Sequence, residues 1–130
     1  MKNEKNFLEE DTEKYLHERV KTLGGKTRKR DAAKMQIRGT PDREVYIPYT
    51  PFDLVETKRP KGGRLSEEQR LRITEFKLCG IEVWLLSTRK EVDAYIDYKA
   101  AQQNFNKNFN REPFEVWQNS MLKEHMTQKQ

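Results

Sequence analysis

Asp42, Glu56 and Lys58 are the residues of this sequence whose types and spacing suit hydrolytic chemistry. Asp42 closes a Gly-Thr-Pro-Asp turn before a predicted strand, and Glu56 and Lys58 end the next strand. Side chains two residues apart on a strand share a face, so Glu56 and Lys58 are expected side by side. Mg²⁺ prefers oxygen ligands, one or two of them carboxylates. Asp42 and Glu56 are therefore candidate metal ligands, and the carbonyl of Thr57 could add another oxygen.

Such a site could hydrolyse a phosphodiester. A divalent cation makes bound water easier to deprotonate and neutralises the charge that develops on the phosphate. Lys58 would position the attacking water and offset negative charge in the transition state. Glu13 lies on the apolar stripe of a predicted helix, where an ionised carboxylate costs energy unless it is paired or metal-bound. Gln69, in the first turn of the helix after Lys58, could hydrogen-bond Lys58 or the water.

Each of these signals also has a structural interpretation. Glu-x-Lys is a common salt-bridge pair, and Pro-Asp by itself is a turn signal. Glu13 could lie exposed at the rim of its helix, and Gln69 could serve only as the capping-box partner of Ser66. Their joint occurrence at this spacing favours the catalytic interpretation.

The elements that must position these residues follow from hydrophobic periodicity and from turn residues. The predicted order is α-β-β-β-α-β-α plus a C-terminal helix, an α/β (α+β) chain with a mixed central sheet flanked by helices. A domain over 1–101 is predicted, followed by a linker and helical extension over 102–130. The compact apolar run 81–86 is the best candidate for a central strand. The predicted helices cover 7–23, 66–80, 88–101 and residues from Pro113 onward, and the other strands cover 26–30, 43–47 and 52–57.

The charge distribution indicates a polyanionic partner. The 130-residue chain carries a net charge of +5, and residues 19–43 hold nine Lys or Arg against two acids. Basic blocks of this density attract nucleic acid, although a solvated basic surface is the alternative. The candidate phosphate-binding residues flank the acids in sequence, and they are Arg28, Lys29, Arg30, Lys34, Arg38, Lys61 and Arg64.

Composition excludes several classes of protein. A single cysteine, Cys79, rules out a disulfide framework and a cysteine-based zinc cluster. No apolar run approaches the ~18 residues of a membrane span, and the polar, acidic N-terminus does not resemble a signal peptide. A soluble, cytoplasmic protein without a membrane partner is predicted.

Three segments carry a family resemblance: 38–43 (Arg-Gly-Thr-Pro-Asp-Arg), 54–60 (Leu-Val-Glu-Thr-Lys-Arg-Pro) and 65–69 (Leu-Ser-Glu-Glu-Gln). Together they resemble the VRR-NUC domain, the virus-type replication-repair nuclease of the PD-(D/E)xK superfamily, over about residues 8–97. The resemblance implies a restriction-endonuclease-like core. Asp42, Glu56 and Lys58 match the catalytic set. Glu13 matches a helix glutamate, with Glu9 and Glu10 as alternatives, and Gln69 matches the family glutamine.

The resemblance also implies an activity and partners. It suggests a Mg²⁺-dependent DNA endonuclease, with Mn²⁺ able to substitute, that acts on branched DNA of the Holliday junction type in a bacterial or phage-infected cell. It further suggests a homodimer, which the apolar face of the last helix also favours, unless Phe114 and Trp117 pack on their own domain. In this family a glycine-bearing turn is expected where the sequence has 48–51 (Pro-Tyr-Thr-Pro).

The alternative function is a non-catalytic DNA- or RNA-binding accessory protein with the same fold. The intact acids and lysine argue against it. An RNA-binding module would also want exposed aromatic side chains on a sheet face for base stacking, and the aromatic residues here are predicted to be mostly structural.

Overall fold

The computed structural model describes residues 3, 6–30, 38–109 and 112–128. Its elements confirm the predicted order of helices and strands. In sequence they are α1 (Glu9–Thr22), β1 (Lys26–Lys29), β2 (Arg43–Tyr46), β3 (Asp53–Thr57), α2 (Glu67–Leu78), β4 (Val83–Leu86), α3 (Arg89–Lys107) and α4 (Glu112–Gln128).

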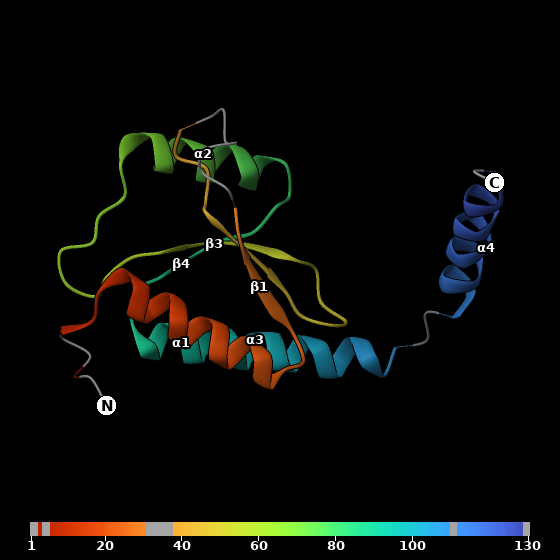
Figure 1. Cartoon of the computed structure of the whole chain (residues 1–130), viewed down its shortest axis with the longest axis horizontal. Coiled ribbons are helices and arrows are strands. Elements are labelled where there is room, and N and C mark those ends of the chain that lie inside the picture. The colour runs from red at the N-terminus through yellow and green to blue at the C-terminus, as the bar shows by residue number, and fades with distance from the viewer. Residues whose placement is uncertain (1–2, 4–5, 31–37, 110–111, 129–130) are drawn as a thin grey trace.

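The four strands form one mixed sheet in the spatial order β1-β2-β3-β4. The first three strands are antiparallel neighbours, and β4 joins β3 in parallel after the crossover through α2. Helices α1 and α3 lie on one side of this sheet and α2 on the other (Figure 1). The predicted mixed sheet flanked by helices is thus confirmed.

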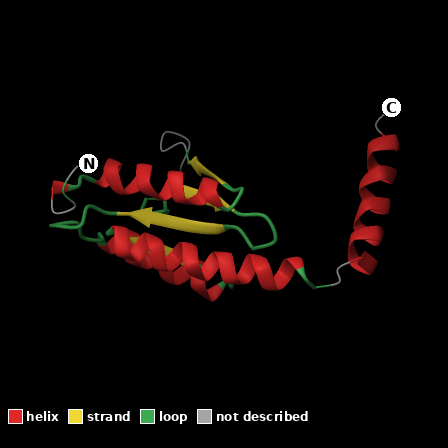
Figure 2. Ribbon diagram, turned by 90° about the horizontal axis from the view of Figure 1, so that it is seen from below, coloured by secondary structure: helices red, strands yellow, loops and turns green. Residues whose placement is uncertain are grey.

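The core lies between the sheet and the α1–α3 pair, which run side by side across it (Figure 2). Period-two alternation on the strands and helical periodicity on α1 and α3 supply its apolar side chains. Its buried members are Leu16, Val20, Val45, Ile47, Val55, Leu86, Val92, Tyr95 and Ile96. On β3 this alternation turns Val55 toward α1 and α3, which sends Glu56 to the α2 side.

The prediction that 81–86 forms the central strand is wrong. The strand β4 lies at the edge of the sheet, and Leu85 keeps 41% of its surface exposed. The strand buried along its whole length is β3, although it contains Asp53, Glu56 and Thr57. Helices on both faces bury β3, and each of its polar side chains finds a partner on one of those helices, so polarity misled the sequence interpretation.

The predicted end of the third helix at Ala101 is also wrong, because α3 continues to Lys107. Amide side chains that suggested a linker instead anchor this last part of the helix. Gln103 Nε2 donates to the carbonyl oxygen of Leu23 at 2.8 Å, and Asn106 Nδ2 donates to that of Tyr49 at 2.8 Å. The predicted boundary between 1–101 and 102–130 therefore falls inside α3. The division of the chain into a nuclease domain and an extension stays a prediction.

Tyr49 occupies the position where a glycine-bearing hairpin turn was expected. Its φ of +66° lies in the left-handed region, which side chains with a Cβ rarely adopt. The bond from Asn106 to the Tyr49 carbonyl holds this conformation. The turn therefore keeps its shape without glycine.

No helix in the described ranges is both long and apolar enough to cross a lipid bilayer.

Candidate active site

Glu56 and Lys58 lie side by side at the end of β3, as the two-residue spacing predicted. Lys58 Nζ is 3.3 Å from Glu56 Oε1. Glu56 is buried, and Lys58 is partly buried. The carboxyl end of the strand thus presents an acidic and a basic side chain as an ion pair, on the α2 side of the sheet.

Gln69 is the capping-box partner of Ser66, and it also reaches the site, although not through the predicted bond to Lys58. Its backbone N–H donates to Ser66 Oγ at 3.1 Å, and its Oε1 accepts from the Ser66 backbone N–H at 2.9 Å, which completes the capping box. Its Nε2 donates to Glu56 Oε1 at 2.7 Å, rather than bonding to Lys58. Lys58 and Gln69 therefore both contact Oε1 of Glu56.

Asp42 reaches the same region from the turn before β2. Gly39 makes this turn possible, because it has a φ of +84° and a Cβ there would lie 2.3 Å from the Glu68 backbone in α2. The turn therefore packs directly on the first turn of α2. Asp42 Oδ1 is buried and has no hydrogen-bond partner among the described residues. A buried, unpartnered carboxylate oxygen is costly unless something binds it.

The first turns of α1 add two more carboxylates. Glu9 and Glu13 are one helical turn apart and so share a face of α1. One carboxylate oxygen of each and one of Asp42 lie within 4.8 Å of one another. Glu10 instead lines a neighbouring hollow with Lys14 and His17. Of the three glutamates that the sequence offered, Glu9 and Glu13 lie beside Asp42.

Glu13 of α1 is held in place by contacts to two strands of the sheet, β2 and β3. Arg43 Nη2 donates to Glu13 Oε2 at 3.0 Å, and Thr57 Oγ1 donates to Glu13 Oε1 at 3.2 Å. The Thr57 side chain thus faces α1, opposite to Glu56, as strand alternation predicted. Arg43 was not among the predicted site residues, although its place directly after Asp42 at the start of a strand was visible in the sequence.

Burial, together with neighbouring carboxylates, raises the pKa values of Glu56, Asp42 and Glu9. Burial first, and then the charge of Asp42, raise the pKa of Glu56 to about 7, against the lowering effect of Lys58. Burial and then Glu13 raise the pKa of Asp42, while burial is also the main cause that raises the pKa of Glu9. Burial is the main cause of each shift, and the crowding of neighbouring carboxylates adds to it. A bound cation would relieve the crowding.

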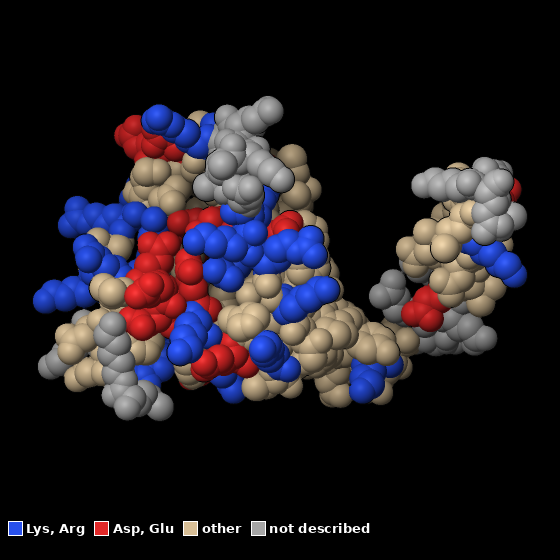
Figure 3. All heavy atoms as spheres, in the orientation of Figure 1, with Lys and Arg blue, Asp and Glu red and all other residues tan. Residues whose placement is uncertain are grey.

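Cationic side chains surround this acidic group. Asp42, Glu56, Lys58 and Gln69 line an open hollow of about 590 Å³, together with Arg38 and Arg64. Figure 3 shows acidic side chains gathered between Lys and Arg side chains on this face. Lys29 is close enough to lower the pKa values of Glu9 and Asp42.

The remaining predicted DNA-binding residues are not among those that line this hollow. Arg28 is exposed on β1, Arg30 donates its backbone N–H to the carbonyl oxygen of Asp42, and Lys61 is exposed in the loop after β3. Lys34 lies outside the described residues. Arg43 is a neighbour of the site that the sequence analysis did not select, whereas Glu9 was named there only as an alternative to Glu13. For Glu9, the four-residue spacing from Glu13 was the available signal.

Comparison with known proteins agrees with the resemblance. No protein-family profile matches the sequence, and no curated protein matches it. A solved structure described as a "VRR_NUC domain" is similar, with 29% sequence identity and a TM-score of 0.61. The match covers 68% of this chain and 94% of that structure. The chain has the VRR-NUC fold, which is that of a nuclease-type domain.

Proposed function

From this fold and this arrangement of acids, we propose that the protein is a divalent-metal-dependent DNA endonuclease. The observation that supports this most directly is the partly buried group of Glu9, Glu13 and Asp42. Glu56 and Lys58 line the adjoining hollow. Arg38 and Arg64, which also line the hollow, could bind the phosphates of a nucleic acid backbone. A nucleic acid is therefore the substrate that we propose.

The donors present suit a hard divalent cation such as Mg²⁺, with Mn²⁺ as a substitute. All of them are oxygen atoms, and Asp42 Oδ1 is buried without another partner in the described chain. Asp42 and Glu56 would hold the ion, with the Thr57 carbonyl and either Glu9 or Glu13 as further donors. When bound, the ion would acidify water and neutralise charge on the phosphate.

The residues of the chain would then orient the reaction. Lys58, fixed 3.3 Å from Glu56, would direct the attacking water and stabilise the charge that builds on the non-bridging oxygens. Gln69 would keep Glu56 in one orientation through its 2.7 Å bond. Arg38 and Arg64 would bind flanking phosphates. Attack of water on phosphorus breaks the phosphodiester bond and leaves a phosphate and a hydroxyl end.

Branched DNA is the proposed substrate, because these contacts would fall on phosphates and not on base edges. A homodimer would supply a second active site for the second strand of a junction. In support, α4 keeps apolar side chains exposed, among them Val116, Met121 and Leu122. Sedimentation of the full chain tests this proposal, and a monomer at micromolar concentration would contradict it.

A cleavage assay tests the proposed activity. The full chain is incubated with a four-way junction, a flap, a single strand and a linear duplex in Mg²⁺, Mn²⁺ or EDTA. We expect cleavage in either metal, none in EDTA, and a preference for branched substrates. The Asp42→Asn variant should bind the junction but not cut it. Cleavage in EDTA, or an active Asp42→Asn enzyme, would contradict the mechanism.

A non-catalytic nucleic-acid-binding protein is the second candidate. It is favoured by an aromatic pair, Tyr46 and Phe52, which stack on the sheet with ring centroids 5.9 Å apart. Binding without cleavage in any metal would support this candidate over the nuclease.

A further inference from the structure

The rings of Tyr46 and Phe52 form a platform at the opposite end of the sheet from the acids. Their planes are inclined by only 21°, and Phe52 is 45% exposed. Alternation places both on the α2 side of the sheet, because their neighbours Val45 and Asp53 point to the α3 side. The aromatic residues were expected to be mostly structural, but the Phe52 ring keeps much of its surface open to solvent, while Tyr46 is half-buried.

Tyr49 extends the aromatic surface at the tip of the β2–β3 hairpin. It is 48% exposed and shares with Tyr46 and Phe52 a surface hollow of about 480 Å³. Its left-handed backbone is held by Asn106 of α3. A tyrosine kept in a strained conformation at an exposed tip indicates a contribution beyond packing.

Positive charge lies beside this platform. The register of β1 and β2 pairs Lys26 with Tyr46 and Arg28 with Glu44, which places all four on one face. The Arg28 guanidinium is 6.0 Å from the Tyr46 ring centroid, within cation–π range. Lys26 and Arg28 are exposed, whereas Glu44 is half-buried. Aromatic rings flanked by cations match a ligand with flat bases and a phosphate backbone, and they match an apolar peptide less well.

The platform and the acidic hollow lie along one strand. Phe52 directly precedes β3 and is four positions from Glu56, roughly 13 Å at the usual rise of a strand, and the alternation places both on the same side of the sheet. That distance equals about four stacked base steps. A strand of DNA cut at the acids could therefore reach the platform within a few nucleotides.

We infer that Tyr46, Phe52 and Tyr49, with Lys26 and Arg28 beside them, bind unpaired nucleotides of the DNA substrate next to the cleavage position. This inference deepens the proposed function and rests on it. Unpaired bases stack on the rings, while their phosphates meet Lys26 and Arg28. Flaps and single-stranded tails offer such bases, whereas an intact duplex and a fully paired four-way junction do not, so the platform would favour branched DNA that carries a single-stranded segment.

Binding in EDTA tests the inference without cleavage. Fluorescence anisotropy compares a blunt duplex with the same duplex carrying a single-stranded tail, for the full chain and for Phe52→Leu, which keeps an apolar side chain. We expect Phe52→Leu to weaken binding of the tailed DNA by at least about fivefold, since stacking on an aromatic ring is worth ~1–3 kcal/mol per base. Binding of the blunt duplex should not change.

Two variants serve as controls. Phe52→Trp keeps a stacking surface and should retain the preference for tailed DNA. Phe105→Ala removes an exposed aromatic ring of α3 that does not line this hollow, and it should bind both DNAs as the wild type does. Thermal melting confirms that each variant is folded.

Several results would overturn the inference. They are unchanged tail binding by Phe52→Leu, an equal loss in Phe105→Ala, tighter binding of an RNA tail than of a DNA tail, or self-association of the wild type that Phe52→Leu abolishes. Cleavage separates the two proposals. If the wild type cuts DNA and Phe52→Leu keeps full tail binding, the proposed nuclease function stands and the inference about the platform is wrong. If tail binding depends on Phe52 but no DNA is cut, the platform stands and the proposed nuclease function is wrong.

Discussion

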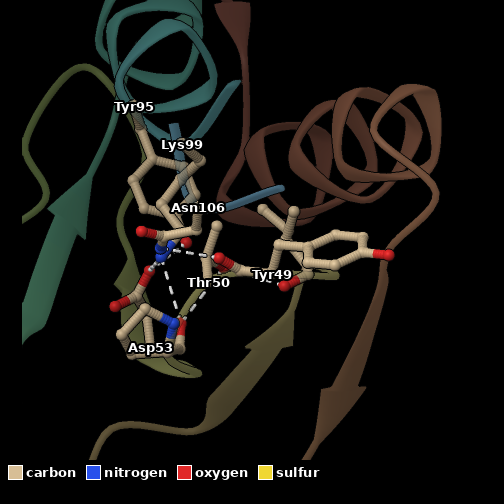
Figure 4. Close-up of polar contacts among 8 residues, drawn as sticks. Tyr49, Thr50, Asp53, Tyr95, Lys99 and Asn106 are labelled. Atoms are coloured by element: carbon tan, nitrogen blue, oxygen red, sulfur yellow. Dashed lines mark hydrogen bonds and ion pairs between the residues drawn. The ribbon is translucent and has the colours of Figure 1, made fainter. Parts of the chain in front are cut away.

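The two ends of β3 each carry a buried carboxylate, but in opposite electrostatic surroundings. At the first end, Asp53 Oδ2 lies 2.9 Å from Lys99 Nζ and accepts a 2.6 Å hydrogen bond from the Tyr95 hydroxyl. Figure 4 shows Tyr95 and Lys99 of α3 directed at Asp53. Lys99 also donates to the carbonyl oxygen of Pro51 at 3.1 Å. At this end one cation pairs with one anion.

At the other end, the carboxylates outnumber the cations that pair with them directly in the described chain. Of Glu9, Glu13, Asp42 and Glu56, Glu13 pairs with Arg43 and Glu56 with Lys58, while Lys29, Arg38 and Arg64 lie around the group. One oxygen of Asp42 has no hydrogen-bond partner among the described residues. A matched buried pair holds elements together, whereas partly buried carboxylates in excess favour the binding of a cation from outside. The contrast therefore separates a structural cluster from a candidate binding site on one strand.

The largest expected effect concerns the matched end. Lys99→Met leaves Asp53 buried without its cation, so the free energy of unfolding should fall by about 3–5 kcal/mol. Urea titration followed by circular dichroism measures this. The double variant Lys99→Met/Asp53→Asn should recover part of the loss, because it removes the uncompensated charge. A Lys99→Met protein as stable as the wild type would show that the pair is not structural.

The next effect concerns chemistry at the other end, where carboxylates are in excess. Glu56→Gln keeps the shape of the side chain but removes its charge, and cleavage in Mg²⁺ should fall by about 10²–10³-fold while junction binding persists. Asp53→Asn is the matched control on the same strand and should retain the activity of each folded molecule. Equal losses in the two variants would mean that the two ends do not differ in function.

The ionised Glu56 carboxylate should also lower the free energy of unfolding when no metal is present. The pKa of Glu56 is about 7 in the folded protein, above its usual 4.5, so the native state binds more protons between these values. Below pH 4.5 the carboxyl is protonated in both states, so the free energy of unfolding is not lowered. The loss of stability grows as the pH rises from 4.5 to 7. In EDTA at pH 8, Glu56→Gln should therefore be more stable than the wild type by ~1–3 kcal/mol. The difference should shrink toward pH 5 in urea titrations.

The smallest effect follows from the same titration. Protons and a divalent cation compete for Glu56, so affinity for Mn²⁺ should rise about tenfold from pH 6 to pH 8 if only the ionised carboxylate binds. Isothermal titration calorimetry measures this. Affinity that stays constant over this range would place the ion away from Glu56.

Much of the site followed from local sequence. The two-residue spacing gave the contact between Glu56 and Lys58, and the Ser66 capping box placed Gln69 at the start of α2. The position of Asp42 before a strand was equally clear. Sequence could not decide between Glu9, Glu10 and Glu13, because that choice depends on how α1 is rotated where it crosses the sheet.

The sequence by itself determined the order of the elements, the strand faces and the charge balance, because these depend on spacing along the chain and on side-chain chemistry. Only the tertiary structure decided which distant groups meet: Glu9 and Glu13 with Asp42, Lys99 with Asp53, and Tyr46 with Phe52. The same packing put the polar β3 at the centre and the apolar β4 at the edge. Burial is a property of the surrounding elements, so a strand's own composition does not settle it.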